Sequence, residues 1–392
     1  MNGFSNRLDI ILFGATGFTG RSEADLKNVL SEIQQRTGED YSKIPIIQAN
    51  VEDVKSIEEM TAAAKVIINC VGPYTQYGEV VVQACIQTGT HQIDICGASF
   101  VEPQYIEDIQ KKYHQPAKEK GVYIVSGCAI DSMAADLGAI LIQKKYEGNI
   151  DEIESHLCFS EGVSSSGPIA NYGTYDSFLR GFGGNARFRD FLKLCTLSSI
   201  KDIFVKRRAL NAWYILFPAS DQSLLNKTQK HMNEVYGQKL TIVKDYLGFS
   251  KFGEFFSMIL MAPIVLLLSK CDCGRNSLRK HPRFFSCGNS DFGGPGEQAQ
   301  KDTEFRVVLV GKGSKKSKTQ QKKIIADVSG KDPYALTCTF AVISAIMILT
   351  ESHKMPDSGG HYSPGAAFAN TCVVERLEKY GFKFDMNSKI EL

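Results

Sequence analysis

A series of glycines follows directly on a short apolar run near the start of the chain, and it limits the possible folds more than any other feature. The apolar run ends at Phe13, and glycines occupy positions 14, 17 and 20. A buried strand that ends in such glycines is typical of the first strand of a doubly wound sheet. In that fold Gly14 forms the tight turn, Gly17 lets the backbone approach a pyrophosphate, and Gly20 lets the next helix pack on the strand. The alternative is a plain strand–turn–helix without a ligand.

The composition indicates a folded intracellular protein with reduced thiols. The 392 residues are enough for about two domains, and a net charge of +2 gives no reason to expect a nucleic acid partner. Several of the 11 cysteines lie in or beside apolar strands, which favours buried thiols over a disulfide framework. The N-terminus lacks the apolar core of a signal peptide.

Strands and helices alternate regularly through the first 150 residues. A helix with one apolar face is expected from Ser22, and the series then continues with strands at 44–49, 65–71, 92–96 and 122–126 and helices at 51–64, 80–88, 102–120 (broken near Pro116) and 134–144. This alternation predicts an α/β fold with a mostly parallel, Rossmann-like sheet and helices on both faces. We therefore expect a dinucleotide-binding domain over residues 1–150.

A different pattern begins near residue 151. A strand is predicted at 153–159 and a helix near Phe178, and strands at 303–310 and 324–328 are predicted to pair across a lysine-rich link. The link favours a solvated hairpin loop over a nucleic-acid patch. An apolar helix is predicted at 336–349, followed by a glycine-rich turn and a last amphipathic helix. We expect an α+β domain for substrate binding or dimerisation over 151–330.

The segment Phe255–Leu268 is apolar, contains Pro263, and has a basic flank. A membrane-spanning helix needs about 20 residues, so this segment is too short for a standard span. An apolar helix with a basic flank suits an anchor lying in a lipid surface, and the alternative is a buried core helix.

Five stretches together resemble the saccharopine dehydrogenase-like oxidoreductases: FGATGFTG (13–20), NCVGPYTQYGEVVVQACIQTG (69–89), IDICG (93–97), AIDSMAADLG (129–138) and GGHYSPGAAF (359–368). The resemblance implies a Rossmann domain completed by C-terminal segments, here 331–392, with an α+β domain inserted between them. It also implies an oxidoreductase of unknown substrate, and relatives of this kind include trans-acting enoyl reductases of lipid assembly. Animal members are associated with lipid droplets, so the expected location is a lipid droplet, a cytosol-facing membrane or the mitochondrion.

The chain departs from the family pattern at three places. After the glycine loop, Arg21 and Ser22 look like the end of the second strand joined directly to the loop, so the first helix and second strand are missing, about 30 residues. Ala98–Val101 is an insertion that displaces a carboxylate near the expected cleft. Ala134 stands where the family has a proline. The shortened segment supports two alternatives to an active enzyme, namely an inactive lipid-surface or scaffold protein and a truncated form of an active one.

The predicted cofactor is NADP or NAD. NADP is favoured, because the resemblance implies that an arginine at the tip of the second strand indicates NADP, and Arg21 is what remains of that tip. Glu39 and Asp40 have the spacing of a ribose ligand but lie in a loop, so we discount them. The predicted cofactor-binding residues are Gly14, Ala15, Thr16, Gly17, Phe18, Thr19, Gly20, Arg21, Asn69, Val71, Gly72 and Pro73.

Other polar residues give weaker signals. Asp131 and Ser132 would either line the cleft or cap the 134–144 helix, and Tyr74 and Tyr77 would either face a ligand or pack. His156 and His361 have no partner visible in the sequence, so no catalytic residue is assigned. Cys271 and Cys273 lack a second pair at zinc spacing, and no metal is expected. The expected partners are a small or lipid-linked substrate, a lipid surface and a second copy of the chain.

Overall fold

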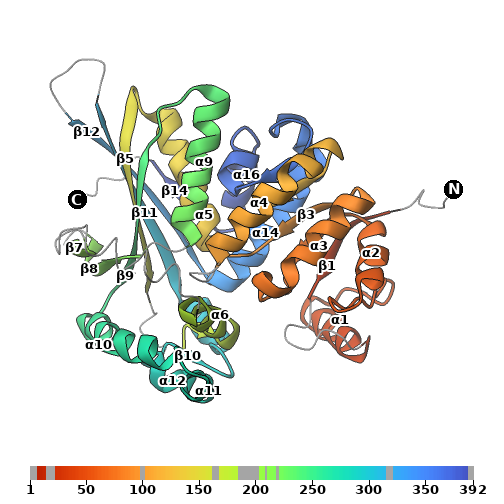
Figure 1. The fold of residues 1–392 in the computed structure, drawn as a ribbon, viewed down its shortest axis with the longest axis horizontal. Coiled ribbons are helices and arrows are strands. Elements are labelled where there is room, and N and C mark those ends of the chain that lie inside the picture. The colour runs from red at the N-terminus through yellow and green to blue at the C-terminus, as the bar shows by residue number, and fades with distance from the viewer. Residues whose placement is uncertain are drawn as a thin grey trace. The chain divides into compact units, whose positions relative to one another are not determined.

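The computed structural model describes residues 7–14, 23–97, 102–160, 167–183, 203–207, 210–217, 220–314 and 321–386. The chain divides into two compact units that interleave along the sequence (Figure 1). The first unit comprises Met1–Cys96, Tyr105–Cys128 and Ala341–Tyr362, and the second comprises Gly97–Gln104, Ala129–Phe340 and Ser363–Leu392. Each unit has its own sheet.

The first unit contains a five-stranded parallel sheet, sheet A, in the order β1-β2-β3-β4-β13. The predicted strands at 65–71, 92–96 and 122–126 are confirmed. The strands of sheet A are β1 (Leu8–Phe13), β2 (Ala64–Asn69), β3 (His91–Asp94), β4 (Tyr123–Val125) and β13 (Gly360–Tyr362). Their central apolar side chains, such as Ile67, Ile93 and Ile124, are completely buried. This burial on both faces explains why these strands are continuous apolar runs in the sequence.

Helices connect these strands as the sequence predicted. They are α2 (Val54–Ala62), α3 (Tyr74–Thr88) and α4 (Glu102–Glu119). The side chain of Asp53 caps α2 by accepting backbone N–H groups of Lys55 and Ser56. The predicted break near Pro116 is wrong, because α4 contains this proline and runs on to Glu119.

The outer side of β1 differs from the prediction. Residues 44–49 form no strand, and within the described part of the chain β1 pairs only with β2. The helix α1 (Glu23–Thr37) forms, yet none of its side chains is buried, and Ile33 is 38% exposed. A short apolar run becomes a strand only where a neighbour accepts its hydrogen bonds. The parallel α/β fold is confirmed, but in the described residues β1 is an edge strand and all other strands of sheet A lie on one side of it.

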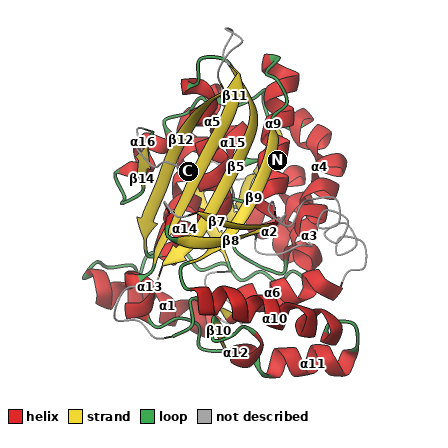
Figure 2. Ribbon diagram, turned by 90° about the vertical axis from the view of Figure 1, so that its left-hand side faces the viewer, coloured by secondary structure: helices red, strands yellow, loops and turns green. Residues whose placement is uncertain are grey.

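The second unit is built on a seven-stranded sheet, sheet B, in the order β14-β12-β11-β5-β9-β8-β7. Figure 2 shows its long strands side by side. They are β5 (Asn149–Ser160), β7 (Phe204–Arg207), β8 (Ala212–Leu216), β9 (Ile242–Phe249), β11 (Glu304–Ser314), β12 (Gln321–Lys331) and β14 (Lys383–Asp385). The predicted hairpin is confirmed, because β11 and β12 pair antiparallel with Val310 opposite Ile325. Its link, 315–320, lies outside the described residues.

Two helices, α5 (Ile130–Lys145) and α9 (Ser220–Tyr236), pack on one face of sheet B. Gly138 of α5 allows the close approach, because a Cβ there would lie 2.3 Å from Cδ1 of Leu309 in β11. Phe305, Val307 and Leu309 of β11 are completely buried on this face, whereas the opposite face carries charged side chains such as Lys312 and Glu154. Sheet B is mixed, because β5 and β9 pair parallel while its other pairs are antiparallel, and it has one core face and one polar face.

The remaining elements of the second unit are short or lie at the ends of sheet B. They are β6 (Ala170–Asn171), α6 (Tyr172–Gly183), α10 (Phe252–Leu268), α11 (Asp272–Lys280), α12 (Pro282–Phe285), β10 (Ser290–Asp291), α13 (Glu297–Asp302), α15 (Pro364–Phe368) and α16 (Val373–Glu378). The predicted apolar helix 336–349 is α14 (Pro333–Glu351), followed by the short helix η3 (Ser352–Lys354). The span Pro333–Lys354 is long and apolar enough to cross a membrane, but half of its most apolar window is buried inside the protein. We interpret α14 as a core helix.

Candidate functional site

Polar side chains gather at the carboxyl ends of four neighbouring strands of sheet A. Asn69 ends β2, Asp94 ends β3, Ser126 follows β4, and His361 lies in β13. All four are buried. The carboxyl edge of a parallel sheet is where ligands of open α/β folds bind, so these residues form the candidate site of the first unit.

Asp94, Ser126 and His361 form a continuous hydrogen-bonded chain. The Ser126 hydroxyl donates to Oδ2 of Asp94 at 2.8 Å, and Nε2 of His361 lies 3.1 Å from Oγ of Ser126. Since the serine proton is directed at the carboxylate, Nε2 of His361 must donate its own proton to Oγ. The order is histidine to serine to aspartate, which differs from the order of an acyl-transfer triad.

Asp94 also holds the ends of two strands together. Its Oδ1 accepts the backbone N–H groups of Cys96 at 3.0 Å and Gly127 at 3.2 Å. Burial raises the pKa of Asp94 to about 6, and the hydrogen bonds from Ser126, Cys96 and Gly127 oppose that rise. The carboxylate therefore fixes the shape of the sheet edge through backbone donors as well as through Ser126.

The tip of β2 contains the predicted residues Asn69, Val71, Gly72 and Pro73. Oδ1 of Asn69 accepts the Val71 N–H at 3.0 Å, and its backbone oxygen accepts the hydroxyl of buried Tyr74 at 2.9 Å. These two bonds leave Nδ2 of Asn69 buried and without a hydrogen-bond partner in the described structure. Gly72 is exposed, and a Cβ there would make only ordinary van der Waals contacts with Tyr74, at 3.9 Å and more. Tyr74 is thus a packing residue with a polar contact, whereas Tyr77 is half-buried.

Gly14 lies against the same tip. Its φ is +94°, which favours glycine, and a Cβ there would lie 2.9 Å from Cγ2 of Val71 and 3.1 Å from the carbonyl carbon of Cys70. The end of β1 and the tip of β2 are therefore in contact through this glycine. The other loop positions predicted to bind the cofactor, Ala15, Thr16, Gly17, Phe18, Thr19, Gly20 and Arg21, lie outside the described residues, as does the 98–101 insertion. Cofactor binding by each of these residues stays a prediction.

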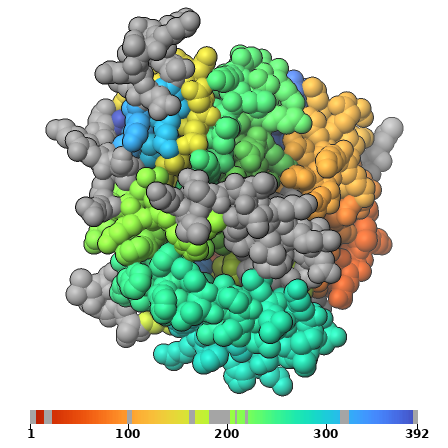
Figure 3. Space-filling view, turned by 60° about the vertical axis from the view of Figure 1, so that its left-hand side comes forward, coloured from red at the N-terminus to blue at the C-terminus, as the bar shows by residue number. Residues whose placement is uncertain are grey.

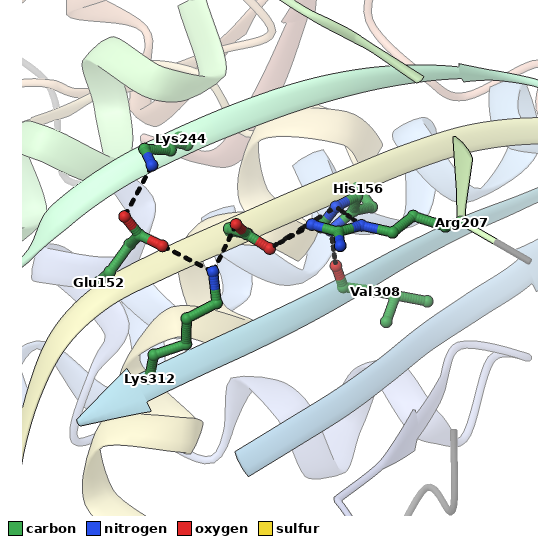
Figure 4. A network of polar contacts seen from close by, with 7 residues as sticks. Glu152, His156, Arg207, Lys244, Val308 and Lys312 are labelled. Atoms are coloured by element: carbon green, nitrogen blue, oxygen red, sulfur yellow. Dashed lines mark hydrogen bonds and ion pairs between the residues drawn. The ribbon is translucent and has the colours of Figure 1, made fainter. Parts of the chain in front are cut away.

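A second polar network covers the charged face of sheet B (Figure 4). Nζ of Lys312 contacts Glu152 at 2.7 Å and Glu154 at 2.6 Å, and Lys244 contacts Glu152 at 2.8 Å. Arg207 contacts Glu154 at 2.6 Å, although β7 and β5 are separated by two strands in the sheet order. The β7–β8 end of sheet B must therefore fold over this face.

His156 is fixed as a neutral side chain in this network. Nε of Arg207 donates to its Nε2 at 3.1 Å, so Nδ1 carries the proton and donates to the Val308 carbonyl at 3.3 Å. Burial, together with the positive charge of Arg207, lowers the pKa of His156 to about 3. The His156 ring packs between Tyr214 and Tyr246, with ring centroids 5.1 and 5.0 Å away, so this buried neutral histidine has a structural role.

The first turn of α5 does not use the predicted cap. The N-cap of α5 is Ala129, and Oδ1 of Asp131 accepts the N–H of Ser132 instead. The Ser132 hydroxyl donates to Asp221 of α9, so Ser132 joins the two helices. Nearby, Asp136 accepts from Thr228 at 2.8 Å and from the Gly365 N–H at 2.6 Å. Ser132 is therefore a buried link within the second unit, and its predicted role as a helix cap is wrong.

No group of three or more potential metal ligands occurs in the described ranges. Cys271 and Cys273 are exposed neighbours, with their sulfur atoms 3.3 Å apart.

The sequence alone did not single out Asp94 and Ser126. Each is a polar residue at the end of an apolar strand, in the stretches QIDIC and YIVSG. That position is the one signal that points to the carboxyl edge of a sheet. The partner of His361 is 235 residues away in the sequence, and no local pattern indicates it.

Comparison with known proteins extends these observations. Residues 10–125 match the family described as the saccharopine dehydrogenase NADP binding domain. The saccharopine dehydrogenase-like oxidoreductase of Mus musculus is 31% identical over 429 aligned positions, covering 98% of each chain. The lipid droplet localized protein of Caenorhabditis elegans is 30% identical over 438 positions, covering 99% of this chain and 100% of that one. Both alignments exceed the 392 residues of this chain, so they contain gaps in it.

Among solved structures, apo histidine-tagged saccharopine dehydrogenase (L-Glu forming) from Saccharomyces cerevisiae has the same fold. Its TM-score is 0.54 at 13% identity, and the match covers 97% of this chain and 100% of that chain. The predicted α/β fold with a second sheet is thereby confirmed. The NADP-binding match likewise confirms NAD(P) as the cofactor at the level of the domain.

Proposed function

The chain belongs to the saccharopine dehydrogenase-like oxidoreductases, and from this premise we propose that it transfers a hydride between NADP and a lipid-linked substrate at a lipid surface. The observation that carries the enzymatic part is the polar carboxyl edge of sheet A, built by Asn69, Asp94, Ser126 and His361. The observation that carries the lipid part is the exposed apolar side of α10.

The residues at the tip of β2 fit the nicotinamide half of a dinucleotide. The buried Nδ2 of Asn69 offers a donor that the protein itself leaves unused. Gly14 and exposed Gly72 keep side chains away from the path that a phosphate and ribose would follow. When bound, NADP supplies or accepts the hydride.

The hydrogen-bonded chain of sheet A would position this edge. The carboxylate of Asp94 accepts hydrogen bonds from the backbone at Cys96 and Gly127. The Ser126 hydroxyl links this carboxylate to His361. Because Nε2 of His361 keeps its proton in this arrangement, the histidine is held in one tautomer. We assign these three as positioning residues.

The helix α10 supports the lipid part of the proposal. Of its 17 residues only Phe255 and Val265 are buried. The large apolar side chains at 252, 256, 260, 264 and 267 share one side of the helix, and their exposed fractions run from 47% for Ile264 to 72% for Leu267. We call this set the α10 stripe. A patch of this kind marks an interaction site, because water solvates it poorly.

The opposite side of α10 is pinned to the protein at two points. Near its start, Phe255 packs on Trp213 with ring centroids 5.7 Å apart and on Phe249 at 5.8 Å. Near its end, Val265 packs in a cluster with Tyr175, Leu179 and Leu278. The helix is therefore rigidly presented with the α10 stripe outward, and Figure 3 shows α10–α12 on the surface of the second unit.

Charge at the same place favours a phospholipid surface over an apolar protein groove. Lys270, Lys280 and Arg283 are exposed directly after the α10 stripe, and Phe284 beside them is 67% exposed. Apolar side chains next to basic ones are typical of helices that lie in the interface of an anionic membrane. Because about half to three-quarters of each side chain of the stripe is still exposed, burying the rest would contribute about 1–2 kcal/mol per side chain.

The test of the enzymatic part is binding of NADPH and NADH to the full chain by calorimetry. We expect micromolar binding of NADPH that is lost in Gly14→Ala, because the new Cβ would displace the tip of β2. Gly38→Ala is the matched control, since Gly38 also has a positive φ, +76°, but nothing lies within 4 Å of its Cβ position. Binding that Gly14→Ala leaves unchanged would contradict the placement of the cofactor.

The test of the lipid part is flotation with vesicles of phosphatidylcholine and phosphatidylserine. Leu260→Asp with Leu267→Asp should abolish flotation, whereas Leu240→Asp, at an equally exposed leucine outside α10, should not. Equal flotation of both variants would refute the role of the α10 stripe.

A second candidate function is that of a lipid-surface protein without catalysis. It is favoured by β1 at the edge of sheet A and by α1 without a buried side chain, because the adenosine half of a Rossmann site uses strands on that side of β1. A folded chain that floats with vesicles yet binds neither NADPH nor NADH would establish this candidate and exclude the first.

A further inference from the structure

The corner between α10 and α11 carries two exposed thiols at the end of the α10 stripe. Cys271 is the N-cap of α11, and Cys273 follows within its first turn. Leu267, the most exposed member of the stripe, lies four residues before Cys271. The thiols and the stripe therefore belong to one compact surface.

The corner is rigid. A Cβ at Gly274 would lie 2.1 Å from the backbone oxygen of Leu268, so the first turn of α11 packs directly on the end of α10. The N–H of Cys271 bonds to the Leu268 oxygen at 3.4 Å, and Arg275 donates to the Ser269 oxygen at 2.8 Å. The position of the two thiols relative to the α10 stripe is thus fixed by backbone contacts.

The surroundings of Cys271 favour its thiolate. Sγ accepts the Gly274 N–H at 3.3 Å and lies 3.3 Å from Sγ of Cys273. The hydrogen bond from Cys273, the Gly274 N–H and the charge of Arg275 lower the pKa of Cys271, whereas the same contact raises that of Cys273. The Gly274 N–H that points at its Sγ makes Cys271 the better nucleophile of the two.

We propose that Cys271 is a site of S-acylation by a long-chain acyl thioester of coenzyme A, with Cys273 as its hydrogen-bond donor. The thiolate of Cys271 forms a bond to the carbonyl carbon of the thioester, and the bond from that carbon to the coenzyme A sulfur breaks. The proton that left Cys271 ends on coenzyme A, so nothing is oxidised or reduced.

The attached chain would extend the α10 stripe into the lipid. One acyl chain alone holds a protein weakly and reversibly on a membrane, and stable anchoring needs a second signal. The α10 stripe and the basic side chains at 270, 280 and 283 supply that signal here. The inference rests on the lipid docking proposed above, and it explains why reactive thiols lie at the end of that surface.

The experiment incubates the full chain with palmitoyl-coenzyme A and the same vesicles, and counts hydroxylamine-sensitive acyl groups by intact mass. We expect one acyl group, reduced at least about tenfold in Cys271→Ser and formed more slowly in Cys273→Ala, which removes the hydrogen-bond donor. Serine is a good N-cap, so Cys271→Ser should preserve α11. Cys338→Ser is the matched control, because Cys338 is also exposed but lies in α14, outside the α10–α11 corner.

Three results would overturn the proposal: no acyl group on the wild-type chain, equal acylation of Cys271→Ser, or recovery of Cys271 and Cys273 as a disulfide under the same conditions. Flotation of the Cys271→Ser/Cys273→Ser variant measures docking without acylation. Loss of acylation with unchanged flotation therefore overturns only this inference, whereas loss of flotation contradicts the proposed lipid docking.

Discussion

Ser126 donates its hydroxyl proton to Asp94 across the carboxyl edge of sheet A, and this single direction determines the tautomer of His361. If Ser126 donates to the carboxylate at 2.8 Å, it can only accept from Nε2 of His361 at 3.1 Å. The hydrogen bonds at this edge therefore run in one direction, from His361 to Ser126 to Asp94. A neutral residue at position 94 that donates to Ser126 would reverse this direction.

Replacement of Asp94 by asparagine tests this direction. In Asp94→Asn the amide oxygen can still accept the Cys96 and Gly127 N–H groups, which leaves the NH2 group facing Ser126. Ser126 must then accept from the amide and donate to His361, which changes from the Nε2–H to the Nδ1–H tautomer. Nitrogen-15 chemical shifts of the His361 ring measure the change, and an unaltered tautomer would disprove the direction assigned to the chain.

Removal of the hydroxyl should destabilise the first unit. In Ser126→Ala the buried Oδ2 of Asp94 and Nε2 of His361 each lose a hydrogen bond, and Oδ2 keeps only the long one from Gln92 at 3.4 Å, at a cost of about 1–3 kcal/mol. Denaturant unfolding would measure this loss. Ser257→Ala serves as control, because the exposed Ser257 hydroxyl donates to the Gly253 carbonyl of its own helix. Equal effects of the two variants would argue against the bridging role of Ser126.

The second unit should lose stability as the pH rises from about 4 to 7. Burial raises the pKa of Asp136 and of Asp245 from 3.8 to about 7, so the unfolded chain ionises first as the pH rises. The contribution of these two protonated carboxyl groups to the free energy of unfolding is complete below their ordinary pKa. It is lost as the pH rises to their raised pKa, by up to about 1.4 kcal/mol per pH unit for each group. Asp136→Asn should flatten this slope, and Asn at exposed Asp9 should not. The free energy of unfolding of both variants, measured at several pH values, tests these two expectations.

His156 should stay neutral through the physiological range. Its pKa is lowered to about 3 by burial and by Arg207, and the bond from Arg207 holds the proton on Nδ1. Ring carbon and nitrogen shifts of His156 are therefore expected to stay constant between pH 5 and 8. A titration in that range would mean that Arg207 does not contact the ring in solution.

The α10–α11 corner offers a matched pair of glycine substitutions. Gly274→Ala should destabilise the protein, by about 1–3 kcal/mol, because its Cβ meets the Leu268 backbone at 2.1 Å. Gly253→Ala, in the first turn of α10 with nothing within 4 Å, should be neutral or stabilise by up to about 1 kcal/mol. Thermal unfolding compares them, and a harmless Gly274→Ala would contradict the tight corner that positions Cys271.

Much of the fold could be predicted, because the pattern of apolar and polar residues within a short stretch of the sequence indicates the strand or helix that the stretch forms. The strands β2, β3 and β4 are short apolar runs between helices, and the β11–β12 hairpin alternates polar and apolar residues. The run at 44–49 has the same apolar character but forms no strand, since strand formation depends on a neighbour that the run itself does not reveal.

The site was less predictable because its contacts are distant in sequence. Gly14 and Asn69 were identified from motifs, and the structure places Gly14 against the tip that Asn69 begins. Ser132 was expected either to line the cleft or to cap α5, but it bonds to Asp221, which is 89 residues further along the chain. Asp94 and His361 meet through Ser126 only because β13 pairs with β4, and the sequence of either strand gives no indication of that pairing.

The late position of β13 in the chain has a consequence for biosynthesis. β4 ends at Val125, whereas its neighbour β13 begins at Gly360. A ribosome must therefore extend the chain from Val125 to Tyr362 before β13 can pair with β4, and until then Asp94 and Ser126 lack His361 as a neighbour. Chains that terminate early would keep an open strand edge, the kind of surface that chaperones and proteases recognise. Completion of the site thus requires that synthesis has passed Tyr362.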